Sequence, residues 1–193
     1  MSSKSELVNV GSPLGRSTTL PIIVLPFNSA FGARSSLVAN AYFEPSAQIV
    51  EDEVKDLSIA AENKGLKLNL IQDENQSCIV NGDKEKIRQI IINFIDNSIK
   101  YTKEGNIDIS IVNKDDKILF SVKDTGIGMT PEIKSTLFHK FTRGDGARMN
   151  TSGSGLGLYL AKEIALAHKG RVWVESDGLD KGSIFYLELD AVK

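Results

Sequence analysis

The chain has 193 residues, of which 41% are hydrophobic and 25% charged, and this balance predicts a globular domain with a hydrophobic core. Its 23 basic and 25 acidic residues give a net charge of −2, so the composition gives no reason to expect nucleic acid as a partner. The single cysteine excludes an internal disulfide framework and fits a reducing, cytoplasmic compartment. No apolar run approaches the ~20 residues that span a bilayer, so we expect no membrane segment in this chain.

Residues 1–42 are rich in Ser and Gly and lack a sustained periodicity. We expect them to form a poorly ordered leader of unknown structure, native or a truncation remnant, ahead of a domain at residues 43–193. An alternative interpretation is a signal peptide built on Leu20–Phe27. Pro21 and Pro26 interrupt that apolar stretch, which favours the leader.

The first half of the domain shows regular patterns. Apolar spacing predicts a helix between Pro45 and Gly65, and alternation predicts a strand at Leu66–Ile71. A short strand at Cys78–Asp83 leads into a helix at Lys84–Tyr101, with Asp83 as its N-cap.

The second half begins with a hairpin, in which strands 106–113 and 117–124 are joined by a turn at Asn113–Asp116. A short helix follows Pro131, residues 142–152 form a polar loop, and a helix covers Leu156–Lys169. Two strands, 171–176 and 182–189, complete the chain. These elements predict an α+β two-layer sandwich, in which helices cover one face of a mixed, mostly antiparallel sheet.

The helix at Lys84–Tyr101 carries a polar stripe beside its apolar face. At 100° per residue the face directed to the core contains Ile87, Ile91, Phe94 and Ser98. Asn93, Asn97 and Lys100 lie along one edge of that face, where a cavity could form. Taken alone, this stripe is equally typical of semi-exposed helix residues.

Two glycine-bearing segments follow. In "DTGIGM" (residues 124–129) the carboxylate of Asp124 can accept a hydrogen bond from an exocyclic amine, and the glycines allow a flat ring to approach the backbone. The same string could be a strand-to-helix turn with Asp124 as a cap. In "GSGLGL" (residues 153–158) glycines open a helix, whose N-terminal N–H groups can bind an anion.

Two common nucleotide-binding motifs are excluded by context. The P-loop pattern G-x-x-x-x-G-K-[ST] is absent, and the glycines of "GSGLGL" follow a polar loop and not the first parallel strand of a Rossmann unit.

The order of four motifs is specific where each alone is weak. N-x-x-x-N, D-x-G-x-G, "LFHKFTR" (residues 137–143) and G-x-G-L-G-L occur in that sequence. Residues 43–190 therefore resemble the catalytic and ATP-binding domain of sensor histidine kinases, which belong to the GHKL superfamily and have the Bergerat fold. The four motifs resemble the N, G1, F and G2 boxes of that family.

The resemblance implies a role for each motif in binding ATP and Mg²⁺. Asn97 would coordinate the magnesium ion, with Asn93 beside it, and Lys100 and Tyr101 would contact the phosphates and the nucleotide edge. Lys140 and Arg143 would reach the terminal phosphate, and residues 142–152 would form the ATP lid. The implied catalytic residues are Asn93, Lys140 and Arg143. The other implied nucleotide contacts are Asp124 on the adenine amine, Gly126, Ile127, Gly128 and Met129 in the base pocket, Phe138 and Phe141 at the base of the lid, and Gly153, Gly155, Leu156, Gly157 and Leu158 at the phosphates.

Asn93 also separates subgroups of the superfamily. The ATP-hydrolysing members and the serine kinases resemble this chain but have a glutamate at that position. An asparagine cannot accept a proton near neutral pH, which disfavours efficient hydrolysis. The resemblance thus implies a kinase, with a GHKL serine kinase or ATPase as an alternative.

The chain lacks the phosphoacceptor motif of the family. His139 lies in the F-box region, and His168 lies at a helix C-terminus, where its ring can bond terminal carbonyls. The resemblance implies a histidine-bearing dimerisation domain, in a longer protein or in trans, and a downstream response regulator. A second alternative is a nucleotide-gated interaction module without phosphotransfer of its own.

Overall fold

The computed structural model describes residues 41–43, 47–72, 78–140 and 155–192. Its main sheet has five strands, in the spatial order β2-β4-β5-β7-β6. These are β2 (Lys67–Gln72), β4 (Asn106–Lys114), β5 (Lys117–Asp124), β7 (Ser183–Asp190) and β6 (Arg171–Glu175). β2 and β4 are parallel and the other neighbours are antiparallel. A separate pair joins β1 (Ala41–Phe43) to β3 (Val80–Gly82).

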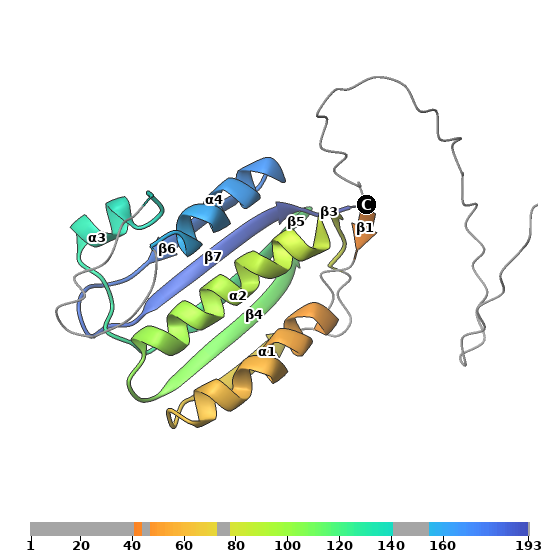
Figure 1. The fold of residues 1–193 in the computed structure, drawn as a ribbon. Coiled ribbons are helices and arrows are strands. Elements are labelled where there is room, and N and C mark those ends of the chain that lie inside the picture. The colour runs from red at the N-terminus through yellow and green to blue at the C-terminus, as the bar shows by residue number, and fades with distance from the viewer. Residues whose placement is uncertain (1–40, 44–46, 73–77, 141–154, 193) are drawn as a thin grey trace, which may run out of the picture. The chain divides into compact units, whose positions relative to one another are not determined.

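Three helices lie on one face of the sheet, with α2 (Lys84–Tyr101) between α1 (Ala47–Glu62) and α4 (Gly157–Ala167) (Figure 1). The short helix α3 (Pro131–Thr136) lies at one end of this layer. The predicted α+β two-layer sandwich is therefore confirmed. None of the helices in the described ranges is both long and apolar enough to cross a bilayer.

Helix α2 is the centre of the core. The Asp83 carboxylate accepts the Lys86 N–H at 3.2 Å and so caps its N-terminus, as predicted. The predicted inward face is also confirmed: Ile87, Ile91, Phe94 and Ser98 are each at most 2% exposed. Burying one such large apolar side chain stabilises the fold by about 1.5–3 kcal/mol. The rigid α2 scaffold carries the polar stripe along its flank.

Two local features differ from the sequence prediction. The β4–β5 turn is tighter than expected, because only Asp115 and Asp116 lie between the strands. Both residues have positive φ, 54° and 61°, as a two-residue type I′ hairpin requires. Strand β1 was not predicted, since three residues carry too little pattern to indicate a strand.

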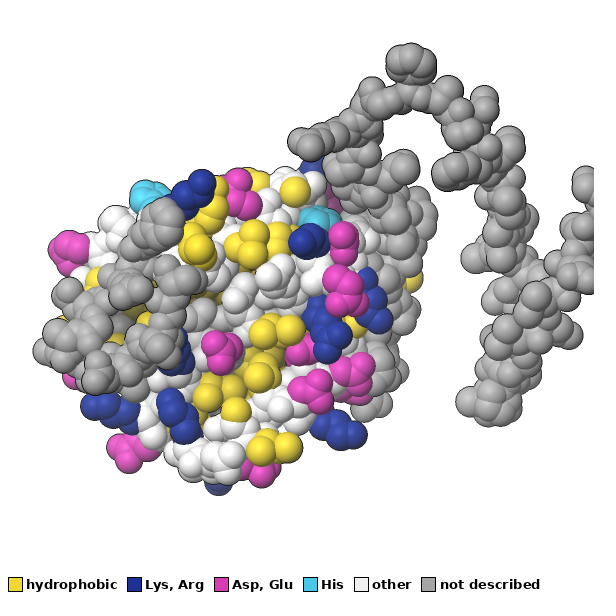
Figure 2. Space-filling view, viewed as in Figure 1, with side chains coloured by type: hydrophobic (Ala, Val, Ile, Leu, Met, Phe, Trp, Pro, Cys, Tyr) yellow, Lys and Arg dark blue, Asp and Glu magenta, His cyan; other side chains and the backbone are white. Residues whose placement is uncertain are grey.

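Charged side chains of both signs are intermingled over the helix-covered face, with apolar side chains among them (Figure 2). Among the described residues this face therefore has no large field of a single sign.

Candidate nucleotide site

The polar stripe of α2 lies beside the core, as its spacing along the helix predicted. Its residues Asn93, Asn97 and Lys100 are half-buried. The Asn97 Nδ2 donates to the Asn93 backbone oxygen at 2.5 Å. A carbonyl can only accept, so the nitrogen must face it and the Asn97 oxygen is directed elsewhere. That oxygen is of the kind that Mg²⁺ binds. Within the described residues no cluster of three or more His, Cys, Asp or Glu side chains could hold a metal ion.

Asn93 connects α2 to the second predicted glycine motif. Its Nδ2 donates to the Gly157 backbone oxygen at 3.3 Å, at the first residue of α4. A Cβ on Gly157 would lie 2.8 Å from the Asn93 Oδ1. The absence of a side chain at Gly157 therefore allows the two helices to approach at the point where both motifs meet.

Asp124 ends β5 and is only 5% exposed. Its Oδ1 accepts the backbone N–H groups of Gly126 at 2.9 Å and Ser183 at 3.2 Å, and Ser98 donates its hydroxyl to Oδ2 at 3.4 Å. Burial raises the pKa of Asp124, and the three hydrogen bonds only partly offset that effect. The strand end thus holds a buried acceptor that the sequence predicted for the adenine amine.

Gly126 lies close to this carboxylate and to the C-terminal end of α2. A Cβ on Gly126 would lie 2.6 Å from the Tyr101 backbone oxygen and 3.0 Å from the Thr102 hydroxyl oxygen. That hydroxyl is buried and has no hydrogen-bond partner among the residues that the structure describes. An unsatisfied buried hydroxyl near Asp124 fits a polar group that enters with a ligand, and the absence of a side chain at Gly126 allows the segment after β5 to pack closely against the end of α2.

The segment 126–129 is held by the β6–β7 loop. Asp180 donates its backbone N–H to the Ile127 oxygen at 2.7 Å, and the Ser176 hydroxyl accepts the Met129 N–H at 3.0 Å. The backbone of the predicted base pocket is therefore positioned by a loop about fifty residues further along the chain.

The N-terminus of α4 is a second candidate region for binding an anion. Leu156 occupies its N-cap position and makes no side-chain capping bond, and Gly155 before it has φ of 69°. The first N–H groups of a helix lack intrahelical partners and attract negative charge. Since α4 begins next to Asn93, these donors face the same region as the amide stripe, which fits phosphate binding.

The F-box region is only partly described. Phe138 is half-buried and packs on the core, and the Lys140 ammonium lies 4.9 Å from the centre of the Tyr159 ring. The predictions for Phe141, Arg143, Gly153 and the loop 142–152 fall outside the described residues.

Several contacting residues were missed by sequence reasoning. Ser98 was assigned only to the core face, although a polar residue on an apolar face was the available signal. Thr102, Ser176 and Ser183 follow no motif that we recognised, and their partners are distant in sequence.

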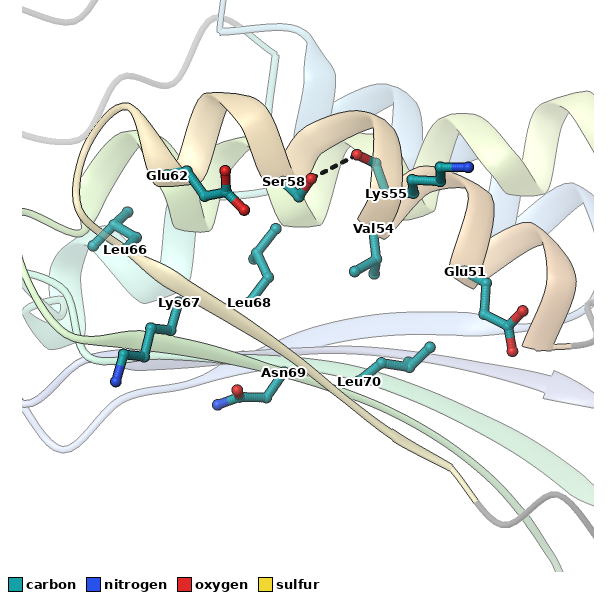
Figure 3. Close-up of a pocket in the computed structure, with 10 residues that line it drawn as sticks. All are labelled: Glu51, Val54, Lys55, Ser58, Glu62, Leu66, Lys67, Leu68, Asn69 and Leu70. Atoms are coloured by element: carbon teal, nitrogen blue, oxygen red, sulfur yellow. Dashed lines mark hydrogen bonds between the residues drawn. The ribbon is translucent and has the colours of Figure 1, made fainter.

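A separate groove of about 430 Å³ lies between α1 and the edge strand β2 (Figure 3). Val54, Leu68 and Leu70 form its apolar part, and Glu51 and Lys55 lie at its rim. None of the residues predicted to bind the nucleotide lines it, so the groove is distinct from the candidate site.

Comparison with known proteins agrees with the motif order. Residues 82–193 match the family described as histidine kinase-, DNA gyrase B-, and HSP90-like ATPase. This match covers more than half of the chain and confirms the resemblance inferred from the four motifs.

Two relatives are named as signalling kinases. The chain is 37% identical over 136 residues to hybrid signal transduction histidine kinase B of Dictyostelium discoideum. The aligned region covers 67% of the chain and 7% of that protein. It is 40% identical over 115 residues to the adaptive-response sensory kinase SasA of Gloeothece citriformis. This second aligned region covers 57% of the chain and 28% of that protein. The chain thus spans less than a third of the length of either relative.

Solved structures show the same fold. Full-length ShkA in complex with AMPPNP matches with a TM-score of 0.70 and 25% identity, over 82% of this chain and 33% of that one. The catalytic domain of histidine kinase ThkA matches with a TM-score of 0.68 and 24% identity, over 78% of this chain and 95% of that one.

Proposed function

The chain belongs to the family of histidine kinase-, DNA gyrase B-, and HSP90-like ATPases, and we propose that it is the Mg-ATP-binding catalytic domain of a two-component sensor histidine kinase. The reaction proposed is transfer of the γ-phosphate to a histidine on a separate dimerisation domain. A response regulator would then be the downstream partner. A cytoplasmic location stays a prediction that rests on the single cysteine.

The observation that carries the proposal is the contact of Asn93 with Gly157. It places Asn93 of the polar stripe of α2 next to the N-terminus of α4. Asn97 would hold the magnesium ion, and the first N–H groups of α4 would hold phosphate oxygens. When bound, a magnesium ion would neutralise the negative charge that develops on the phosphate oxygens during phosphoryl transfer.

The base would be held at the C-terminal end of α2, beyond Asn97. The Asp124 carboxylate would accept the adenine amine, and the buried Thr102 hydroxyl near Gly126 would supply a second polar contact. Lys100 and Tyr101, at the C-terminus of α2, lie between the two regions in the chain. Lys140 would contribute a positive charge to the terminal phosphate, by leaving the ring of Tyr159.

Asn93 determines the acceptor. A carboxylate at this position could take a proton from water, whereas the amide of Asn93 donates to Gly157 and has no basic atom. The proposal therefore predicts slow hydrolysis of ATP and transfer to an acceptor that is already nucleophilic, such as a neutral imidazole.

The test uses labelled ATP, the full chain and dimerisation domains supplied in trans. We expect a labelled, acid-labile phosphohistidine on the supplied domain, and none when Asn97 is replaced by Ala. Binding of Mg-ATP without phosphohistidine on any supplied domain would instead favour the interaction module. Rapid steady-state hydrolysis that increases in Asn93→Glu would identify a hydrolase.

A further inference from the structure

His168, the residue that follows α4, uses both ring nitrogens. Nδ1 lies 2.7 Å from the Ile164 backbone oxygen, and Nε2 lies 3.0 Å from the Asp83 backbone nitrogen. A backbone N–H can only donate, so Nε2 accepts, and Nδ1 carries the proton and donates to Ile164. The bonds require a neutral ring in one defined tautomer.

The two partners belong to different helices. Ile164 is in the last turn of α4, and Asp83 is the N-cap residue of α2. Gly82 permits the approach, because a Cβ there would lie 2.5 Å from the His168 Cδ2 and 2.9 Å from its Nε2. The imidazole therefore joins the C-terminal end of α4 to the N-terminal end of α2 in a site shaped for a ring.

The same two helices meet again at the other end of α4, where Asn93 donates to Gly157. Over its 11 residues α4 is about 16 Å long, so His168 and the first turn form the two ends of one rigid rod. Fixing both ends sets the direction of α4 against α2. That direction sets the separation between the first N–H groups of α4 and the amide of Asn97.

We propose that His168 is a positioning residue for the nucleotide site, which holds α4 in the orientation that presents its N-terminus to the phosphates. The inference rests on the proposed function. His168 touches no substrate in this scheme and acts through α4. A lost anchor at one end of a rod shifts the groups at the other end, and a shift of the first N–H groups of α4 would weaken their binding of phosphate.

Three variants separate this role from simple packing. His168→Phe keeps a ring of similar size but loses both hydrogen bonds. His168→Gln offers an amide oxygen in place of Nε2 and can still accept the Asp83 N–H. The matched control is Glu163→Gln, because Glu163 is an exposed residue on the same helix.

The measurement is the affinity of the full chain for a non-hydrolysable ATP analogue with Mg²⁺, together with KM and kcat for transfer to a supplied dimerisation domain. We expect His168→Phe to bind the analogue about tenfold more weakly, within the range usual for coupling between separate sites. His168→Gln should restore affinity to near that of the wild type, and Glu163→Gln should change nothing. The loss should lie mainly in KM, because binding and not chemistry depends on the orientation of α4.

Nuclear magnetic resonance of the wild type supplies a second measurement that needs no variant. The ¹⁵N shifts of the His168 ring should report the Nδ1–H tautomer, and the Asp83 amide signal should move on addition of the analogue. Two results would overturn this inference and leave the proposed function standing. One is a folded His168→Phe protein with wild-type affinity for the analogue, and the other is an Asp83 amide signal and His168 ring shifts that do not change when the analogue is added. A wild type that binds no nucleotide would overturn both this inference and the proposed function.

Discussion

Asn97 donates its side-chain amide to the backbone oxygen of Asn93, one helical turn earlier and 2.5 Å away. This hydrogen bond turns the amide nitrogen of Asn97 towards the backbone of α2. The amide oxygen of Asn97 therefore points away from that backbone oxygen, where it can accept a bond from a ligand or bind a metal ion. Two asparagines four residues apart on one helix therefore have different tasks. In the proposed site Asn97 would bind the cation, whereas Asn93 contacts α4.

We expect Asn97→Ala to remove the magnesium dependence of ATP binding while the fold is kept. The reason is that the variant loses a metal-ligand oxygen from a half-buried position that the core does not use. Calorimetric titration with ATP, with and without Mg²⁺, measures the effect. Asp96→Ala, an exposed neighbour on the same helix, is the control. An Asn97→Ala protein that keeps both its affinity and its magnesium dependence would refute the assignment.

The second prediction concerns the pH dependence of stability at Asp124. Burial raises its pKa above the ordinary value of 3.8, so the native state binds more protons than the unfolded state between 3.8 and the raised native pKa. The free energy of unfolding therefore falls as pH rises through that window, and the destabilisation is complete above it. Asp124→Asn should be more stable than wild type at neutral pH, and the difference should shrink as pH is lowered through the window.

Binding should respond in the opposite direction. An ionised carboxylate accepts a stronger hydrogen bond from an amine than an amide does, so Asp124→Asn should weaken ATP affinity by about 1–3 kcal/mol. Urea denaturation at several pH values and ATP titration measure the two effects in the same protein. A variant that is less stable at every pH would mean that the bonds from Gly126 and Ser183 need the charge.

The features predicted from the sequence are those that depend on local spacing. The Asp83 cap and the inward face of α2 follow from residues within one or two turns, and both are confirmed. The bond from His168 to Ile164 spans four residues and was expected as a contact with terminal carbonyls. Its second bond, to Asp83, spans 85 residues and could not be inferred from periodicity.

The same distinction applies within the candidate site. The motifs indicated Asp124 and Asn93, because each motif is a short string with a defined chemistry. Ser176 was not indicated, because its hydroxyl in the β6–β7 loop accepts the hydrogen bond from the Met129 N–H. Only the order of the strands in the sheet brings these two residues together. Long-range packing decides such contacts, and one sequence contains no direct record of it.

The third prediction concerns Lys64, which follows α1. Its ammonium donates to the backbone oxygens of Ile99 at 2.8 Å and Lys100 at 3.1 Å, in the last turn of α2. A cation at a helix C-terminus also interacts favourably with the helix dipole. Replacing Lys64 by Met keeps much of the side-chain length and removes the charge, and we expect a loss of about 1 kcal/mol of stability.

The control for Lys64→Met is Lys55→Met, an exposed lysine on α1 at the rim of the groove. Because Lys100 and Tyr101 end α2, fraying there should also weaken ATP affinity in the Lys64 variant and leave the Lys55 variant unchanged. Thermal unfolding and ATP titration of both proteins give the answer. Equal behaviour of the two variants would show that the Lys64 contacts contribute nothing.

The last prediction compares two glycines with similar backbone but different surroundings. Gly65 and Gly128 have φ of 73° and 62°, which disfavours any side chain by about 1–2 kcal/mol. A Cβ on Gly65 would meet nothing within 4 Å, whereas one on Gly128 would lie 2.0 Å from the Gly178 backbone oxygen. A backbone oxygen cannot rotate away, so Gly128→Ala must displace either the predicted base pocket or the β6–β7 loop.

We therefore expect Gly65→Ala to cost only the conformational term, and Gly128→Ala to cost about 1–3 kcal/mol more through overpacking. Chemical denaturation of both variants under identical conditions measures the difference, and Gly65→Ala removes the φ contribution from the comparison. ATP affinity should fall in Gly128→Ala and stay at the wild-type value in Gly65→Ala, since only the former lies in the segment that follows Asp124. Equal stability losses with equal affinities would show that the loop yields without strain and that the close approach at Gly178 does not shape the pocket.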